Sequence, residues 1–311
     1  QKVIGSLTDG DIRRGLLKGF DLNNNAFEVA NKSFKFIRQH HTKKEEIQQF
    51  KEQGISLIPL LDQNGALIRL IDLSRIKALL PLDAVIMAGG KGLRLLPLTK
   101  NIPKPLLKIG DKPIIEHNID RLVSFGIKNL NITINYLGEQ IEDYFKDGTS
   151  KDIQINYIRE DKPLGTIGAL KLIEEFKNDY ILLMNSDLLT NIDLEDILND
   201  FLLKEGDMIL ATIPYQVNIP YGVVETKDSY VTQLKEKPTY TYYSNAGIYI
   251  FKKECLKFVP DKEFFNATDL INVLLEKGKK IINYPILNYW LDIGKHEDYL
   301  KAQEDIKHLK L

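Results

Sequence analysis

A glycine-rich stretch with an arginine and a lysine held between prolines is the part of the sequence best suited to hold a polyphosphate. Residues 89–105 read GGKGLRLLPLTKNIPKP, with Arg94 after the glycines and Lys104 between two prolines. The stretch follows the apolar run 83–88, which reads as a buried parallel strand, so backbone N–H groups can converge on an anion where the strand ends. An arginine fork binds two phosphate oxygens, and a lysine on a stiff backbone supplies a point charge. The residues expected beside the phosphates are Ala88, Gly89, Gly90 and Gly92.

Two familiar phosphate loops are excluded by the spelling of this stretch. It lacks the order of a Walker loop, and Leu95 stands where a dinucleotide fingerprint has its third glycine. The alternative interpretation makes Arg94 and Lys104 ordinary solvated cations on a tight strand-to-helix turn.

Two aspartates follow apolar runs and could bind a divalent cation. Asp187 comes after the run 181–184, and Asp292 lies between Trp290 and Gly294. Magnesium is bound by one or two carboxylates and leaves its other positions to water and substrate. Local sequence alone equally allows each aspartate to cap a helix or form a turn.

The elements that must position these groups alternate between two periodicities. Strand-like runs at 130–134, 153–158, 180–184 and 208–213 alternate with helix-period segments at 114–125, 139–145, 167–176 and 194–203. This alternation predicts an α/β fold with a mostly parallel sheet and helices on both faces. Ligands bind beyond the carboxyl ends of the strands in such sheets, where the glycine loop, Asp187 and Asp292 could meet.

Composition narrows the class of protein. The 311 residues suggest about two domains. A formal net charge of -1 gives no electrostatic case for nucleic acid or an anionic membrane as partner. The single cysteine, Cys255, cannot form an intrachain disulfide, and neither an apolar run near 18 residues nor a signal-peptide pattern is present, so the cytoplasm is expected.

Seven motifs in order across residues 82–311 resemble the sugar-phosphate nucleotidyltransferase family, whose members join a nucleoside triphosphate (NTP) to a sugar 1-phosphate. The motifs are the glycine loop with its continuation at 108–115, PLGTIGAL at 163–170, NSD at 185–187, YGVV at 221–224, EKP at 236–238, NAGIY at 245–249 and WLDIG at 290–294. The resemblance implies a Rossmann-like fold of the GT-A type over residues 82–311.

The resemblance also implies roles for individual residues. Asp187 and Asp292 would bind Mg²⁺, while Arg94 and Lys104 would act on the phosphates. In addition to the glycine loop, Gly165 and Thr166 would contact the nucleotide. The residues that would contact the sugar and its phosphate are Gly222, Glu236, Lys237, Asn245 and Gly247. Glu160 could accept hydrogen bonds from the N–H edge of guanine, or could simply end a strand in water.

The expected activity is nucleotidyl transfer, most similar to that of mannose-1-phosphate guanylyltransferases. A close variant is a glucosamine-1-phosphate guanylyltransferase. The alternatives are a thymidylyl-, uridylyl- or cytidylyltransferase of the same family, and a regulatory nucleotide-binding paralogue without turnover. All four residues that degenerate paralogues usually lose are present: Arg94, Lys104, Asp187 and Asp292.

Residues 1–80 form a different pattern. A helical stretch at 43–53, an apolar run at 55–61, a turn at 62–65 and a second apolar run at 66–71 resemble a CBS module, a small α+β regulatory fold that works in pairs. Residues 3–14 resemble the closing strand and helix of another such module whose first half is missing, which suggests a fragment of a longer protein. Paired modules of this kind tend to associate, so a homo-oligomer is a further expectation.

Gly5, Thr8 and Asp11 match a spacing that often binds an adenine nucleotide in CBS pairs. A regulatory nucleotide could therefore bind there. The alternative is that Thr8 and Asp11 only cap the helix that follows, since both are favoured N-cap residues.

Overall fold

The computed structural model describes residues 2–21, 23–38 and 42–309, and the chain divides into two compact units. The smaller unit contains residues 1–80 with 124–126, and the larger contains 81–123 and 127–311. Within the described ranges, no helix combines the length and the apolar character needed to cross a membrane.

The smaller unit is built on a short three-stranded sheet in the order β1-β2-β3. Its elements are α1 (Asp9–Leu17), α2 (Ala26–Val29), β1 (Ile37–Arg38), α3 (Lys44–Glu52), β2 (Leu57–Leu61) and β3 (Leu67–Asp72). The amphipathic α3 buries Ile47 against Ile37, Ile58 and Ile71 of the sheet. The β2–β3 turn is closed by the Asp62 carboxylate, which accepts the N–H groups of Asn64 and Ala66 at 2.9 and 2.7 Å. The predicted order of helix, strand, turn and strand is confirmed.

Helix α1 begins with a capping box formed by Thr8 and Asp11. The Thr8 hydroxyl accepts the Asp11 N–H at 3.3 Å, and the Asp11 carboxylate accepts the Thr8 N–H at 2.9 Å. The Thr8 hydroxyl also donates to the Asp11 carboxylate at 2.6 Å, and this hydrogen bond, with those from the Thr8 N–H and from Arg14, lowers the pKa of Asp11. Gly5 lies beside the backbone of Asn31, since a Cβ there would stand 3.2 Å from the Asn31 carbonyl oxygen. The capping interpretation therefore has direct support, and the nucleotide at this place stays a prediction.

The larger unit is built on a seven-stranded sheet in the order β15-β11-β14-β9-β4-β7-β8. Its strands are β4 (Leu82–Met87), β7 (Asn129–Ile134), β8 (Gln154–Arg159), β9 (Tyr180–Asn185), β11 (Met208–Asn218), β14 (Thr239–Lys252) and β15 (Ile281–Pro285). The four predicted strands after β4 are confirmed. The sheet is mixed, because β14 runs antiparallel to both β11 and β9 whereas all other neighbours are parallel.

Helices flank this sheet, and three of the four predicted ones are confirmed. They are α4 (Ile114–Ser124), α5 (Gly138–Phe145) and α6 (Leu194–Leu203), followed by α7 (Ala267–Glu276) and α8 (His296–Asp305). The predicted helix over 167–176 is wrong, since only the short 3-10 turn η4 (Gly168–Leu172) forms. The segment instead forms hydrogen bonds between residues three apart, from the Leu170 N–H to the Ile167 carbonyl at 3.0 Å and from the Ile173 N–H to the Leu170 carbonyl at 3.2 Å. The Phe265 carbonyl accepts the N–H groups of Ile167 and Gly168, each at 3.1 Å, and holds the segment against another part of the chain.

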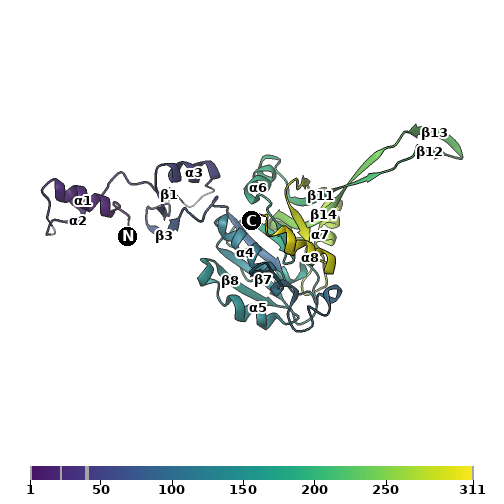
Figure 1. Ribbon diagram of the computed structural model, residues 1–311, viewed down its shortest axis with the longest axis horizontal. Helices are drawn as coiled ribbons and strands as arrows, with labels where there is room; N and C mark the ends of the chain where they lie inside the picture. The colour runs from purple at the N-terminus through teal and green to yellow at the C-terminus, as the bar shows by residue number, and fades with distance from the viewer. Residues whose placement is uncertain (1, 22, 39–41, 310–311) are drawn as a thin grey trace. The chain divides into compact units, whose positions relative to one another are not determined.

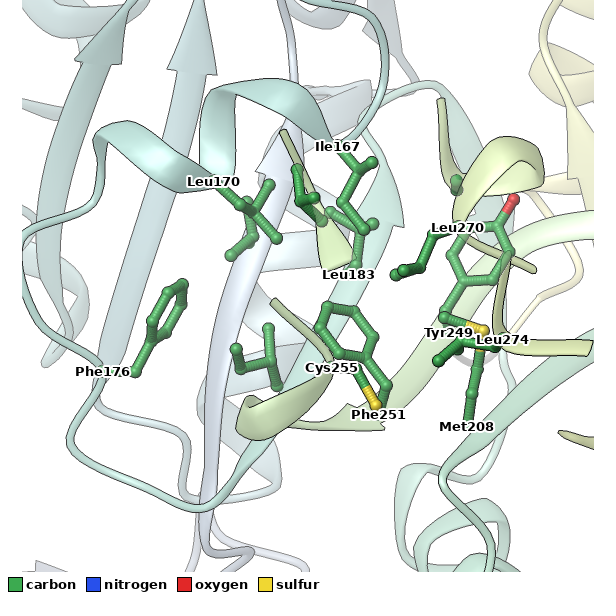
Figure 2. Close-up of a cluster of buried hydrophobic side chains, with 14 residues drawn as sticks. Ile167, Leu170, Phe176, Leu183, Met208, Tyr249, Phe251, Cys255, Leu270 and Leu274 are labelled. Atoms are coloured by element: carbon green, nitrogen blue, oxygen red, sulfur yellow. The ribbon is translucent and has the colours of Figure 1, made fainter. Parts of the chain in front are cut away.

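Buried apolar side chains fix η4 and α7 to the sheet. Figure 2 shows Ile167 and Leu170 beside Leu183 of β9, with Leu270 and other α7 residues on Tyr249 and Phe251 of β14. The buried Cys255 belongs to the same cluster. Burial of such side chains stabilises a fold by about 1.5–3 kcal/mol each. This cluster therefore anchors the segments that precede η4 and α7.

Short elements complete the unit. They are η1 (Leu93–Leu95), η2 (Lys104–Leu106), β5 (Lys108–Ile109), β6 (Lys112–Pro113), η3 (Thr149–Lys151), β10 (Leu188–Thr190), η5 (Lys253–Phe258) and β16 (Trp290–Asp292). Strands β10 and β16 pair with each other in antiparallel register, outside the main sheet.

A two-stranded arm projects from the sheet where β11 and β14 run on beyond it (Figure 1). Its end is the hairpin of β12 (Val223–Lys227) and β13 (Tyr230–Lys235). Several large side chains of the arm are exposed, among them Tyr221 and Tyr230.

Candidate active site

The glycine loop lies in a cleft at the carboxyl ends of β4 and β9. These strands are parallel neighbours, with Met87 paired to Asn185, so residues 88–92 and 185–187 leave the sheet side by side. The cleft has a volume of about 530 Å³. Of the predicted residues, its lining includes Gly89, Gly90, Gly92, Arg94, Lys104, Glu160, Gly165, Thr166 and Asp187. Ala88 is buried directly before it.

Close packing at Gly92 brings Lys104 to the cleft. Gly92 has φ of 63°, and a Cβ there would stand 3.1 Å from the Lys104 Cβ and 3.0 Å from a Thr99 methyl group. The Thr99 hydroxyl also donates to the Gly92 carbonyl at 2.9 Å. A side chain at position 92 would push the Lys104 segment away from the phosphate loop.

The two aspartates are neighbours although 105 positions separate them in the sequence. Asp292 is paired with Leu188 in the β10–β16 ladder, and the Ile293 N–H donates to the Asp187 carbonyl at 3.0 Å. The Oδ1 atoms of both carboxylates are buried without a hydrogen-bond partner. Buried carboxylate oxygens of this kind need a ligand.

These oxygens fit a magnesium ion. The rest of the described chain supplies no third carboxylate, histidine or cysteine to the pair. Magnesium prefers few protein carboxylates and completes its octahedron with water and substrate phosphates, so two aspartates are sufficient.

The charges around the carboxylates are mixed. Lys104 forms an ion pair with the second oxygen of Asp187. Burial raises the pKa of Asp292, and the Asp187 carboxylate raises it further, whereas Lys104 and Arg94 lower it. A cation held between the carboxylates would relieve both unfavourable effects.

Arg94 approaches the carboxylates across a glycine. A Cβ on Gly294 would stand 3.2 Å from an Arg94 guanidinium nitrogen, so the guanidinium packs closely against Gly294. Gly294 also lines the cleft. This second glycine-dependent contact of the site lies two residues after Asp292.

The loop expected to contact the base also lines this cleft. Glu160 accepts the Leu164 N–H at 2.9 Å through Oε2, and a Cβ on Gly89 would stand 3.4 Å from its Oε1. Burial raises the pKa of Glu160, and the Leu164 hydrogen bond opposes that shift. Gly165 has φ of 76° and packs against the Phe265 carbonyl, where a Cβ would stand at 2.6 Å.

A second, smaller cleft of about 300 Å³ adjoins the first. It holds Asn245 and Gly247, two of the residues predicted to contact the sugar, and it shares Thr166 and Asn185 with the larger cleft. The Asn245 side chain accepts the Gly247 N–H at 2.9 Å. The Trp290 indole donates to the Ala246 carbonyl at 3.0 Å, which ties this turn to the strand that carries Asp292.

The other three predicted sugar residues lie elsewhere. Gly222, Glu236 and Lys237 are on the arm, and neither cleft has any of them in its lining. Gly222 and Glu236 do lie together, since a Cβ on Gly222 would stand 3.2 Å from Oε2 of Glu236. Their assignment to the sugar phosphate stays a prediction, and it requires the arm to lie over the smaller cleft in a complex.

The sequence reasoning missed several residues of the clefts. Asn185 and Ser186 line the larger one, and Asn266, Ala267 and Thr268, at the start of α7, line the smaller one. Asn185 could have been found from the sequence, because it is the first residue of the NSD motif that ends at Asp187. The residues of α7 carried none, because only the fold brings them to the glycine loop.

Comparison with known proteins agrees with this geometry. The family model described as nucleotidyl transferase matches residues 83–308. The chain is 30% identical over 232 residues to a mannose-1-phosphate guanylyltransferase of Mycobacterium tuberculosis, a match that covers 72% of this chain and 64% of that protein. It is 33% identical over 232 residues to a D-glycero-alpha-D-manno-heptose 1-phosphate guanylyltransferase of Aneurinibacillus thermoaerophilus, covering 73% and 99%. Among solved structures, HddC from Yersinia pseudotuberculosis superposes with a TM-score of 0.56 at 26% identity, covering 72% of this chain and 99% of that one.

Proposed function

The chain belongs to the nucleotidyl transferase family, and on that premise we propose that it joins an NTP to a sugar 1-phosphate with release of pyrophosphate. The observation that carries the proposal is that Arg94, Lys104 and Asp187 line one cleft with the glycine loop. Asp292 is near enough to these three residues for their charges to shift its pKa. That set of groups suits phosphoryl chemistry between two anions.

In this proposal, a phosphate oxygen of the sugar 1-phosphate attacks the α-phosphorus of the NTP in line with the departing pyrophosphate. The sugar phosphate is already ionised, so no general base is needed. Arg94 stabilises charge on the α-phosphate and pyrophosphate, and Lys104 draws the two phosphates together. Asp187 and Asp292 would hold Mg²⁺, which when bound neutralises phosphate charge.

We further propose that the base is guanine and that Glu160 recognises it. Guanine presents two adjacent N–H donors on one edge, which a single carboxylate can accept. Uracil and thymine present one N–H between two carbonyl oxygens, which a carboxylate repels. Glu160 supports the assignment because its Oε1 faces the glycine loop while Oε2 is held by Leu164. The two relatives described above are guanylyltransferases by name, but a UTP--glucose-1-phosphate uridylyltransferase of Synechocystis is also 33% identical over 241 residues, so the argument for guanine depends on Glu160.

Replacement of the carboxylate tests the base. Glu160→Gln should lower kcat/KM for GTP at least about tenfold, because the glutamine NH2 group would face one of the guanine N–H donors. A bidentate contact to a base contributes about 1–3 kcal/mol of discrimination. The kcat/KM for UTP should fall less. Steady-state kinetics with both nucleotides measure this preference.

Glu139→Gln is the matched control, since Glu139 is an exposed carboxylate paired with Arg159. It should leave both values unchanged. A wild-type protein that uses UTP, dTTP or CTP better than GTP would exclude the guanine assignment without excluding nucleotidyl transfer.

The sugar class proposed is mannose-1-phosphate or glucosamine-1-phosphate. The decisive assay is pyrophosphate release over four NTPs and several sugar 1-phosphates with magnesium. The non-catalytic alternative predicts nucleotide binding with no release in any combination.

For the smaller unit, we retain the hypothesis of a regulatory nucleotide beside Gly5, Thr8 and Asp11. Loss of one charged contact would weaken nucleotide binding about tenfold in Asp11→Ala. Calorimetry with the catalytic cleft blocked measures it, with Asp9→Ala as control because Asp9 is in the same helical turn and pairs only with exposed Arg13. Equal affinity in all three proteins would leave Thr8 and Asp11 with the capping role alone.

A further inference from the structure

Asn185 lies where the two clefts meet. It is the last residue of β9 and lies beside the pair of carboxylates, with Asp187 two positions later. Asn185 and Thr166 are the two residues that line both the larger and the smaller cleft. The clefts assigned to the nucleotide and to the sugar therefore join at these two side chains.

The two junction residues differ in what their side chains already bind. The Thr166 hydroxyl accepts the Ala267 N–H at 2.7 Å, and the Thr166 N–H donates to the Asn266 side chain at 3.3 Å, so Thr166 is tied to the start of α7. The amide of Asn185 makes no hydrogen bond to any residue in the described ranges. A half-buried amide with two donors and an acceptor left over is suited to a ligand.

The backbone beside Asn185 is shaped to accommodate its amide. Gly247 has φ of 71°, and a Cβ there would stand 2.5 Å from the Asn185 Nδ2 and 2.8 Å from its Cγ. No side chain could occupy that position without displacing the amide. The Gly247 N–H donates to the Asn245 side chain, so the smaller cleft holds in place the backbone that leaves room for the Asn185 amide.

We propose that Asn185 is a catalytic residue whose N–H group donates to a non-bridging oxygen of the transferring α-phosphoryl group. This inference rests on the proposed function, because the junction of the two clefts is where the attacking oxygen and the α-phosphorus must meet. The new bond joins the sugar phosphate oxygen to that phosphorus. The bond to the bridging oxygen of pyrophosphate breaks, and its electron pair leaves with the pyrophosphate. No proton moves in the step.

An amide suits this place better than a third cation or carboxylate. It adds a fixed dipole at the oxygen where charge is redistributed, and it does not repel either phosphate. The NTP alone fills the larger cleft through the glycine loop and Arg94. The contact from Asn185 therefore matters most when both substrates are present and react.

Asn185→Leu tests the proposal, since leucine is close in volume to asparagine but cannot form hydrogen bonds. We expect kcat to fall on the order of 10²-fold, as when one donor to a developing charge is removed. The Kd for the NTP, measured by calorimetry without sugar phosphate, should stay within about threefold of wild type. Asn185→Ser has a hydroxyl that is too short to reach the phosphate, so it should show the same loss in kcat with the same unchanged Kd. It provides the test if the protein does not tolerate leucine at position 185.

Asn129→Leu is the matched control. Asn129 is the first residue of β7, so it lies at the amino end of that strand, whereas Asn185 ends β9. Its side chain accepts a hydrogen bond from Lys177 at 2.9 Å, and the variant should keep both kcat and Kd. A kcat within about threefold of wild type in Asn185→Leu, or an equal loss in kcat and NTP affinity, would overturn the catalytic role. Wild-type protein without turnover on any substrate pair would overturn the proposed function itself, and with it this role.

Discussion

Asp187→Asn and Asp292→Asn are each expected to abolish magnesium-dependent turnover while the fold is kept. Each change removes one negative charge from a pair whose Oδ1 atoms are buried without partners. An asparagine oxygen is a weaker ligand than a carboxylate, so metal affinity and phosphate stabilisation fall together. We expect a loss on the order of 10²-fold or more in kcat/KM.

Pyrophosphate release at several magnesium concentrations measures this loss, and the thermal midpoint of unfolding shows whether the fold survives. Asp200→Asn is the matched control, because Asp200 lies on α6, pairs with Lys204 at 2.8 Å and lines neither cleft. Near-normal activity in either site variant would remove that aspartate from the metal assignment.

Individual strands of the sheet were predictable, because each one is a short apolar run in the local sequence. The apolar runs at 130–134 and 180–184 were confirmed as β7 and β9, and α4 and α6 followed from their helical spacing. The direction of β14 was not predictable, because parallel and antiparallel pairing depend on how distant segments connect. The contact that holds the segment 167–176 was not predictable either, because the Phe265 carbonyl that accepts its N–H groups lies far along the chain.

The site also has a part that local sequence predicts and a part that depends on the fold. The glycine loop was recognisable because its residues are consecutive and their chemistry is local. Asp187 and Asp292 were expected at one edge, but their contact depends on the β10–β16 register, which no spacing in the sequence reveals. Family resemblance supplied Glu236 and Lys237, whereas the fold places both on the arm. Asn185 became a candidate only when two clefts were found to share it.

Arg94→Lys is expected to lower kcat/KM on the order of 10²-fold, although it conserves the charge. Arg94 lines the cleft and packs closely against Gly294, and its planar fork can bind two phosphate oxygens. A lysine ammonium is a compact, strongly hydrated point charge that cannot make two parallel contacts.

Arg159→Lys provides the comparison, because Arg159 binds Glu139 and Glu142 at 2.8 and 2.6 Å on the exposed end of β8 and lies outside the cleft lining. Steady-state kinetics should show that this control keeps wild-type activity, while Arg94→Lys also loses sensitivity to inhibition by added pyrophosphate, since the same fork would hold that product. A decrease below about threefold would show that charge alone suffices at position 94. Arg94 would then be an ordinary cation near the cleft, and the in-line positioning of the α-phosphate would depend on Lys104 and the loop backbone instead.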